Sequence, residues 1–439
     1  MPTPPPHVPW RPTSAHVRAC VGGAALALAA TWLRRPDLLV LGAPLLVVAL
    51  WSALSRPGPA PQVDARVAPR TVREGEAVRW TAAVQPVPGL EQATAKLAAG
   101  DFQQVDPPTR TVTVAAPGAP APDALPLTLA VRSTRWGRRT VGPAVVVAHS
   151  AWGGFRWGAH EVEPVGLSTL PVPTRFDTTA PMPHPNGLVG LNRSGRPGDG
   201  SEFASIRPFQ LGDRLRRIHW PVSLRTGSLH VTSSWADQDS HVLLIVDALN
   251  DLGPSEGLDG AASSLDTTVR AAGAMAEHYL HRGDRVSLRV LGSTGTTRVP
   301  AATGKHHLRR VLDALASIEV ASRLEDDPRH ALTGVSAGTV VVLLSPLVSP
   351  VALSHAVTLA RRGLTVIVID TLPEGLTGDD PQEPFAGIAW RVRLLERRRE
   401  LERVQAVGVP VVAWQGPGSL DQVLRDVTRR AAAPRMAQR

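Results

Sequence analysis

The sequence has little that would support a disulfide scaffold or an aromatic platform for nucleic acid. Its one cysteine, Cys20, cannot form a disulfide within the chain. Aromatic residues make up only 4% of the 439 residues, which is too few to suggest a stacking surface for single-stranded nucleic acid. Acidic residues are outnumbered by basic ones, 38 to 47, and the formal net charge of +9 suits an anionic lipid surface, an acidic partner or nucleic acid.

Hydrophobic residues, in contrast, are plentiful at 43% of the chain, enough for real cores. The length allows two or three domains. Residues 1–16 are rich in proline and lack hydrophobic periodicity, which predicts a disordered tail.

Two apolar runs, residues 17–33 and 38–54, follow this tail and are joined by a short polar turn. Each run is about as long as the shortest helix that spans a bilayer. Together they predict a transmembrane helical hairpin, with Trp32 and Trp51 at the run ends, where indole rings favour the headgroup zone. The alternative is a cleaved signal peptide in the first run. The second run and the absence of a small-residue cleavage site weaken this alternative.

Arginines around the hairpin indicate its orientation. Arg11 and Arg18 precede it, and Arg56, Arg66 and Arg70 follow it. The turn also carries two arginines, so the bias is modest, but it favours both ends in the cytoplasm. We therefore expect a multi-pass protein of the cell membrane, in contact with the lipid bilayer, with the soluble bulk and both termini cytoplasmic.

The soluble part divides into three segments by pattern. Residues 62–160 contain short alternating or β-branched runs between Pro/Gly turns, which predicts a small antiparallel β-sandwich. Residues 161–200 are rich in proline and glycine and predict an irregular connector. Residues 201–433 then alternate buried strands with helices, which predicts an α/β doubly wound parallel sheet.

The strand His241–Asp247 is continuously aliphatic and ends in a carboxylate. Such strands are buried on both faces, as in the centre of a parallel sheet. Two similar strands are expected at Thr339–Ser345 and Leu364–Asp370. Because ligands and partners dock at the carboxyl edge of open α/β sheets, Asp247 is a candidate functional residue.

An arginine-rich block precedes that strand. Gly212 and Asp213 predict a helix start with Asp213 as the N-cap, and Pro221 predicts its end. The density of guanidinium groups suggests bidentate partners, either carboxylates of this chain or of another protein. The alternative is a surface helix with solvated arginines. Our candidates for partner docking are Arg207, Asp213, Arg216, Arg217, Trp220, Arg225 and Asp247.

The spacing of this block resembles that of the DUF58 family. The pattern is Arg207-x-Phe209-x-x-Gly212-Asp213-x-x-Arg216-x-Ile218-x-Trp220-x-x-Ser223-x-Arg225-x-x-x-Leu229, followed by an aliphatic strand that ends in Asp. The resemblance implies a membrane-anchored protein with a von Willebrand factor A-like domain. It also implies a partner, because members of this family often accompany MoxR-type AAA+ ATPases.

A metal-binding von Willebrand A domain carries the pattern D-x-S-x-S after its first strand and a second Asp from another loop. Here Asp247 matches, but Leu249 offers no oxygen, Asp251 replaces a Ser, and Ser345 stands where the later Asp is expected. A hard divalent cation needs about six oxygen ligands. We therefore expect a degenerate site with no metal or other cofactor, in which Asp247 caps the next turn or pairs with an arginine.

The leading hypothesis is a non-enzymatic, membrane-anchored interaction or scaffold protein that works with a MoxR-type AAA+ ATPase in the assembly or maturation of a complex. One alternative is a metal-dependent von Willebrand A adhesion or recognition module. The other is a basic nucleic-acid-binding protein, which the predicted membrane hairpin argues against. The identity of the partner and the oligomeric state are left open by the sequence.

Overall fold

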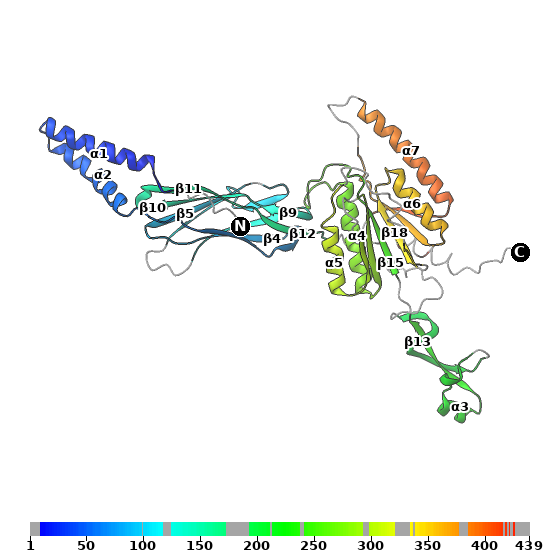
Figure 1. The fold of residues 1–439 in the computed structure, drawn as a ribbon. Helices are drawn as coiled ribbons and strands as arrows, with labels where there is room; N and C mark the ends of the chain where they lie inside the picture. The colour runs from blue at the N-terminus through cyan, green and yellow to red at the C-terminus, as the bar shows by residue number, and fades with distance from the viewer. Residues whose placement is uncertain are drawn as a thin grey trace. The chain divides into compact units, whose positions relative to one another are not determined.

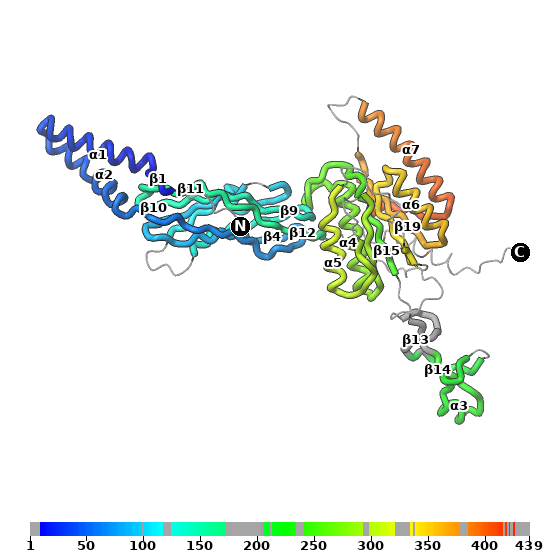
Figure 2. Tube along the Cα trace, in the orientation of Figure 1, coloured from blue at the N-terminus to red at the C-terminus, as the bar shows by residue number. Residues whose placement is uncertain are grey.

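The computed structural model shows a mixed α/β protein with several sheets, divided into two units, Met1–Leu170 and Pro171–Arg439 (Figure 1). The chain order of the elements can be followed in Figure 2. The structure describes residues 9–98, 100–116, 124–172, 193–210, 213–237, 241–292, 298–320, 334–336, 339–376, 385–415, 418, 421 and 425. The helix that the sequence pattern suggests near the C-terminus, at 419–433, lies almost wholly outside these residues.

The first unit begins with two helices, α1 (Ser14–Trp32) and α2 (Asp37–Leu54), which pack against each other. Glycine permits their close approach, because a Cβ atom on Gly23 would lie 2.8 Å from Leu46 Cγ. Among the described residues, α2 alone is long and apolar enough to cross a membrane, whereas α1 does not reach that threshold. The structure thus gives one candidate span where the sequence pattern predicts two.

The expectation of a disordered tail over residues 1–16 is wrong for the part that the structure describes. Trp10 is 4% exposed and belongs to the core of the first unit. Arg11 and Pro12 form strand β1, which pairs with β11 (Phe155–Val162). Thr13 caps α1 by accepting a hydrogen bond from the amide of His16. The proline-rich composition gives no signal that the indole of Trp10 is buried. That burial is favourable enough to order the short segment around it.

Two antiparallel sheets in the first unit share one hydrophobic core. The alternating burial of β4 and β8 shows why these residues form strands, since period-two patterning gives a sheet one buried face. The sheet orders are β1-β11-β10-β5-β7 and β2-β4-β8-β6. The remaining strands of these sheets are β2 (Val63–Ala68), β4 (Ala77–Val84), β5 (Leu90–Leu97), β6 (Gln103–Asp106), β7 (Thr111–Ala115), β8 (Leu125–Ser133) and β10 (Ala144–Ser150); a short 3₁₀ turn, η1 (Ala151–Gly153), follows β10.

The irregular connector expected at 161–200 contains regular structure in the residues described. Strand β12 (Val165–Leu170) pairs in parallel with β3 (Thr71–Arg73) and antiparallel with β9 (Gly137–Val141). Strand β13 (Arg193–Pro208) covers the end of the segment. The Pro and Gly content marks its ends, but the alternating residues Val165 and Leu167 supply an apolar face that the composition obscured.

The arginine-rich block folds differently from the helix that its sequence suggests. Strands β13 and β14 (His230–Asp237) form an antiparallel hairpin. Between them lie a 3₁₀ turn, η2 (Leu215–Arg217), and a short helix, α3 (Trp220–Thr226). Pro221 lies in the first turn of α3, so it begins a helix instead of ending one, as its fixed φ and missing amide allow. His219, not Asp213, is the N-cap.

The second unit also holds a six-stranded sheet, in the order β17-β16-β15-β18-β19-β20. All its neighbouring pairs are parallel except β16 with β17 at one edge. The sheet contains β15 (His241–Asp247), β16 (Arg285–Leu291), β17 (Arg298–Ala302), β18 (Thr339–Ser345), β19 (Thr365–Asp370) and β20 (Val411–Ala413).

Helices cover both faces of this sheet (Figure 1). Helix α4 (Ser264–His281) packs on one face beside α5 (Lys305–Leu315), and α6 (Pro350–Arg361) packs on the other beside α7 (Ala386–Ala406). The start of α4 is a capping box, with reciprocal hydrogen bonds between Ser263 and Asp266. This double cover buries the aliphatic strands and makes the carboxyl edge of the sheet the natural place for a site.

Candidate functional site at the carboxyl edge of the sheet

Asp247, at the end of β15, is 1% exposed and is held by two hydrogen bonds. The hydroxyl of Ser345 donates to Oδ2 at 2.5 Å, and the amide of Leu249 donates to Oδ1 at 3.0 Å. Burial raises the pKa of this carboxyl above its ordinary value, and the two hydrogen bonds oppose that rise. The prediction that Asp247 caps the next turn is correct, and its hydrogen bonds come from a hydroxyl and an amide, not from an arginine.

The other positions of the degenerate metal pattern also serve the fold. The side chain of Leu249 packs on Gly292, where a Cβ atom would lie 2.5 Å from Leu249 Cδ2. Asp251 accepts a hydrogen bond from the amide of Leu265 at 3.1 Å, in the first turn of α4. No group of three or more His, Cys, Asp or Glu side chains suited to a metal ion occurs within the described ranges.

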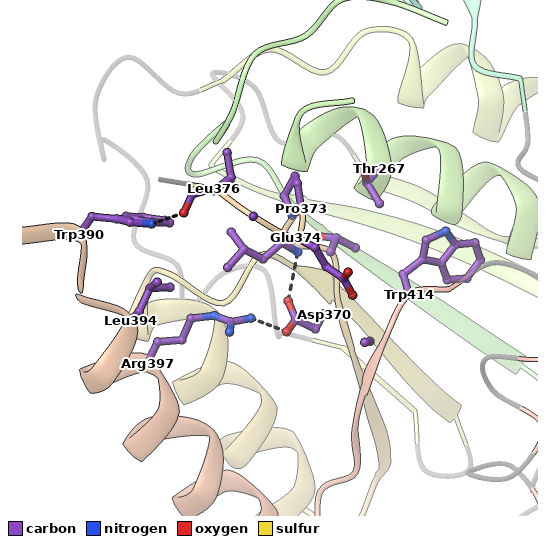
Figure 3. Close-up of a pocket in the computed structure, with 13 residues that line it drawn as sticks. Thr267, Asp370, Pro373, Glu374, Leu376, Trp390, Leu394, Arg397 and Trp414 are labelled. Carbon is purple, nitrogen blue, oxygen red and sulfur yellow. Dashed lines mark hydrogen bonds and ion pairs between the residues drawn. The ribbon is translucent and has the colours of Figure 1, made fainter. Parts of the chain in front are cut away.

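A pocket of about 500 Å³ opens at the same edge, at the end of β19 (Figure 3). Asp370 accepts hydrogen bonds from the amide of Leu372 at 3.1 Å and from the guanidinium of Arg397. Arg397 also donates through Nε to the carbonyl oxygen of Pro346 at 3.0 Å. Arg397, the one basic side chain among the described lining residues, therefore already binds partners within the protein.

The rest of the lining is mostly apolar, with one further acid. Trp390 and Trp414 lie on opposite sides of the pocket in Figure 3, and the indole of Trp390 donates to the carbonyl oxygen of Leu376 at 2.9 Å. The carboxylate of Glu374 points into the space between Asp370 and Trp414. The pocket thus offers indole surface and a carboxylate, a combination that suits a cationic group.

Arg207 and Asp213 form an ion pair within the arginine-rich block. The guanidinium of Arg207 donates to both oxygens of Asp213, at 2.8 and 2.6 Å, and the amide of Gln210 donates to the same carboxylate at 2.8 Å. The hydrogen bonds from Arg207 and Gln210 hold the pKa of Asp213 below its ordinary value. For Arg207 the bidentate partner is a carboxylate of this chain, which is one of the two alternatives expected from the density of arginines.

Several other members of the block are turned to solvent. Trp220 is 58% exposed, Leu215 is 70% exposed and Leu224 is 81% exposed. Trp220 and Leu224 are four residues apart on α3 and so share one helix face. Arg216 and Arg225 are also exposed, whereas Arg217 is half-buried. We call Leu215, Arg216, Trp220, Leu224 and Arg225 the hairpin surface.

One docking candidate needs correction. Asp247 is almost wholly buried, so it cannot belong to an exposed docking surface in this structure. Sequence reasoning also missed the pocket residues Asp370, Glu374, Trp390 and Arg397. A signal for the first existed, because β19 ends in an acid just as β15 does. Glu374 follows Asp370 by four residues, whereas Trp390 and Arg397 reach the pocket through the packing of α7, which spacing along the chain does not reveal.

The fold therefore defines a mixed α/β protein with a candidate membrane helix and an arginine-rich hairpin. The sequence profile of DUF58, described as a protein of unknown function, matches residues 205–396, from β13 into α7. Over 253 residues the chain is 31% identical to an uncharacterised protein of Mycobacterium bovis and to one of Mycobacterium tuberculosis, covering 55% of this chain and 70% of each relative. The chain belongs to the DUF58 family.

Proposed function

We propose that this DUF58 protein is a membrane-anchored interaction protein that carries out no catalysis, and that the hairpin surface binds its partner. By family resemblance the partner is a MoxR-type AAA+ ATPase, and the role is the assembly or maturation of another complex. The exposure of Trp220 and Leu224 beside Arg216 and Arg225 carries the proposal. Tryptophan and arginine are the residues enriched in interaction hot spots, and the exposed Leu224 adds apolar surface beside them.

The sheet supports a von Willebrand A-like assignment for the second unit. Its central strand β15 is followed by the positions at which related domains hold a metal. Here the Ser345 hydroxyl is bonded to Asp247, and Leu249 is turned onto Gly292. We propose that the edge works without a metal, because all four positions make contacts within the fold. Micromolar binding of magnesium or manganese in calorimetry, lost in Asp247→Ala, would instead favour a metal-dependent recognition module.

Membrane anchoring by both helices is supported by their apolar surfaces. Val21 and Leu28 on α1 are 64% and 70% exposed, and Val40 and Leu54 on α2 are 74% and 78% exposed. Side chains of this kind all round a two-helix hairpin favour lipid over water as the surroundings. We propose that α1 and α2 both span the bilayer, with the turn at Arg34–Asp37 outside and the soluble units in the cytoplasm.

The test is co-purification from detergent-solubilised membranes. We expect a MoxR-type ATPase to be recovered with the full-length chain and to be lost with Arg216→Glu/Arg225→Glu, because charge reversal repels a partner that fits two arginines. The matched control is Arg309→Glu/Arg310→Glu, two exposed arginines on α5. Equal recovery of the ATPase with wild type and with Arg216→Glu/Arg225→Glu would refute the hairpin surface as the binding site.

A further inference from the structure

The pocket at the end of β19 has one unbalanced negative charge. Its lining holds two acids, Asp370 and Glu374, and one base, Arg397. Arg397 and Asp370 neutralise each other through their ion pair, and their side chains are only 12% and 20% exposed. Glu374 is exposed and makes no ion pair within the part of the chain that the structure describes. The charge offered to a ligand is therefore that of Glu374.

Apolar and aromatic side chains surround this carboxylate. Trp390 and Trp414 face the cavity from α7 and from the segment after β20, and Leu394 and Pro373 contribute aliphatic surface. Indole faces attract cations through the ring quadrupole, and aliphatic walls favour a ligand with an apolar stem. An anion would find no basic group left to receive it, because the guanidinium of Arg397 is already bound to Asp370 and Pro346.

We propose that this pocket is a binding site for a guanidinium or ammonium group on an apolar stem, with Glu374 as its counter-ion and the two indoles as its walls. Such a group is carried by an arginine or lysine side chain of a partner protein or by a free cationic amine. The positive net charge of the chain does not prevent binding, because charges beyond about 8 Å are screened at physiological salt. The pocket residues are separate in sequence from the hairpin surface, so the proposal for the pocket and the proposal for the hairpin surface can be wrong independently.

The experiment uses the full-length chain in detergent micelles, labelled with 5-fluorotryptophan. Replacing Trp390 or Trp414 with Phe assigns their fluorine resonances among the 11 tryptophans. The probes are acetyl-Ala-Arg-Ala-amide, the same peptide with citrulline in place of arginine, and agmatine. Citrulline keeps the shape of arginine but lacks its charge, so the difference in affinity between the two peptides measures the contribution of the positive charge. Agmatine carries the guanidinium on a free amine and distinguishes that source from a side chain.

We expect the arginine peptide to shift both resonances saturably, and the citrulline peptide to bind about tenfold more weakly, as loss of a charge-assisted contact predicts. Glu374→Gln should weaken the arginine peptide about tenfold, whereas Glu402→Gln, an exposed acid of α7 outside the pocket, should leave its affinity unchanged. Agmatine binding as tightly as the peptide would assign the site to a free amine, and weaker binding to a partner's side chain. Equal affinity for the two peptides, no saturable shift, or an unchanged affinity in Glu374→Gln would overturn the proposal.

Discussion

The hydroxyl of Ser345 donates a 2.5 Å hydrogen bond to the carboxylate of Asp247 and so joins the ends of two neighbouring parallel strands, β18 and β15. The bond occupies an oxygen that a divalent cation would need, and a second donor, the amide of Leu249, occupies the other. The hydrogen bonds at this edge hold β15 and β18 together. Asp247 is then a structural residue, and contact with other proteins must come from elsewhere on the surface.

The first prediction concerns Asp247 itself. Asp247→Ala should lower the free energy of local opening of β15 by about 1–3 kcal/mol, because the Leu249 amide and the Ser345 hydroxyl lose their buried acceptor. Asp247→Asn should be at least as stable as wild type at neutral pH, because it removes a buried charge, still accepts from the Leu249 amide through Oδ1, and can donate through its amide NH2 to the Ser345 hydroxyl oxygen. Hydrogen exchange of peptides that cover 241–247 measures both effects. Strong loss of protection in Asp247→Asn would show that the charge itself is required.

The second prediction concerns the pH dependence at the other end of β15. Burial, and then the charges of Arg285 and Arg289, lower the pKa of His241 to about 4, from an ordinary value of 6.5. Below pH 6.5 His241 binds a proton in the unfolded chain but stays neutral in the folded chain. The free energy of unfolding therefore falls as the pH drops from about 6.5 to about 4. His241→Gln should flatten this decline, because glutamine does not titrate and can hydrogen-bond Ser287 and Thr339.

Thermal unfolding at pH 7 and pH 5 checks this difference. The remaining 13 histidines are common to wild type and variant, so the comparison isolates His241. An identical loss of melting temperature in both proteins would count against the lowered pKa.

The third prediction concerns Trp10, which lies in the core of the first unit although its neighbours in the sequence predict disorder. Trp10→Ala should destabilise that unit by about 3–5 kcal/mol, the usual loss for a buried large aromatic side chain. Trp152→Ala is the matched control, because Trp152 is 67% exposed. Hydrogen exchange of β10 and β11 reports the effect, and equal exchange in the two variants would contradict the burial of Trp10.

The fourth prediction concerns membrane topology. In a Cys20→Ser background, Arg34→Cys lies in the turn between α1 and α2, and Ser354→Cys is exposed on α6. A membrane-impermeant maleimide added to intact spheroplasts should label the first cysteine and should label the second only after permeabilisation. Labelling of Ser354→Cys from outside would reverse the proposed orientation. Failure to label Arg34→Cys would contradict two spans.

The strands of the six-stranded sheet could be predicted because their signal is local. Runs such as His241–Asp247 and Thr339–Ser345 are aliphatic throughout, and only burial on both faces accounts for such runs. The start of α4 at Ser263 has an equally local signal, since its capping box lies within four residues.

The predictions from sequence were wrong or incomplete where a residue with a local sequence signal is bound by a group from another part of the fold. Asp213 has the sequence signature of an N-cap, but the guanidinium of Arg207 binds its carboxylate, and the helix begins instead at Trp220. The pocket depends on Trp390 and Trp414, which come from different parts of the chain and line one cavity only when α7 packs beside the sheet. Patterns along the chain describe each element but do not give the contacts between elements.

The binding of a purified MoxR-type ATPase to the full-length chain in lipid nanodiscs measures whether the hairpin surface binds the proposed partner. We expect saturable binding to wild type and to Arg309→Glu/Arg310→Glu. Binding to Arg216→Glu/Arg225→Glu should be weaker by at least about tenfold, as expected when charges central to an interface are reversed. Equal affinity for all three proteins, or no binding to wild type, would contradict the account.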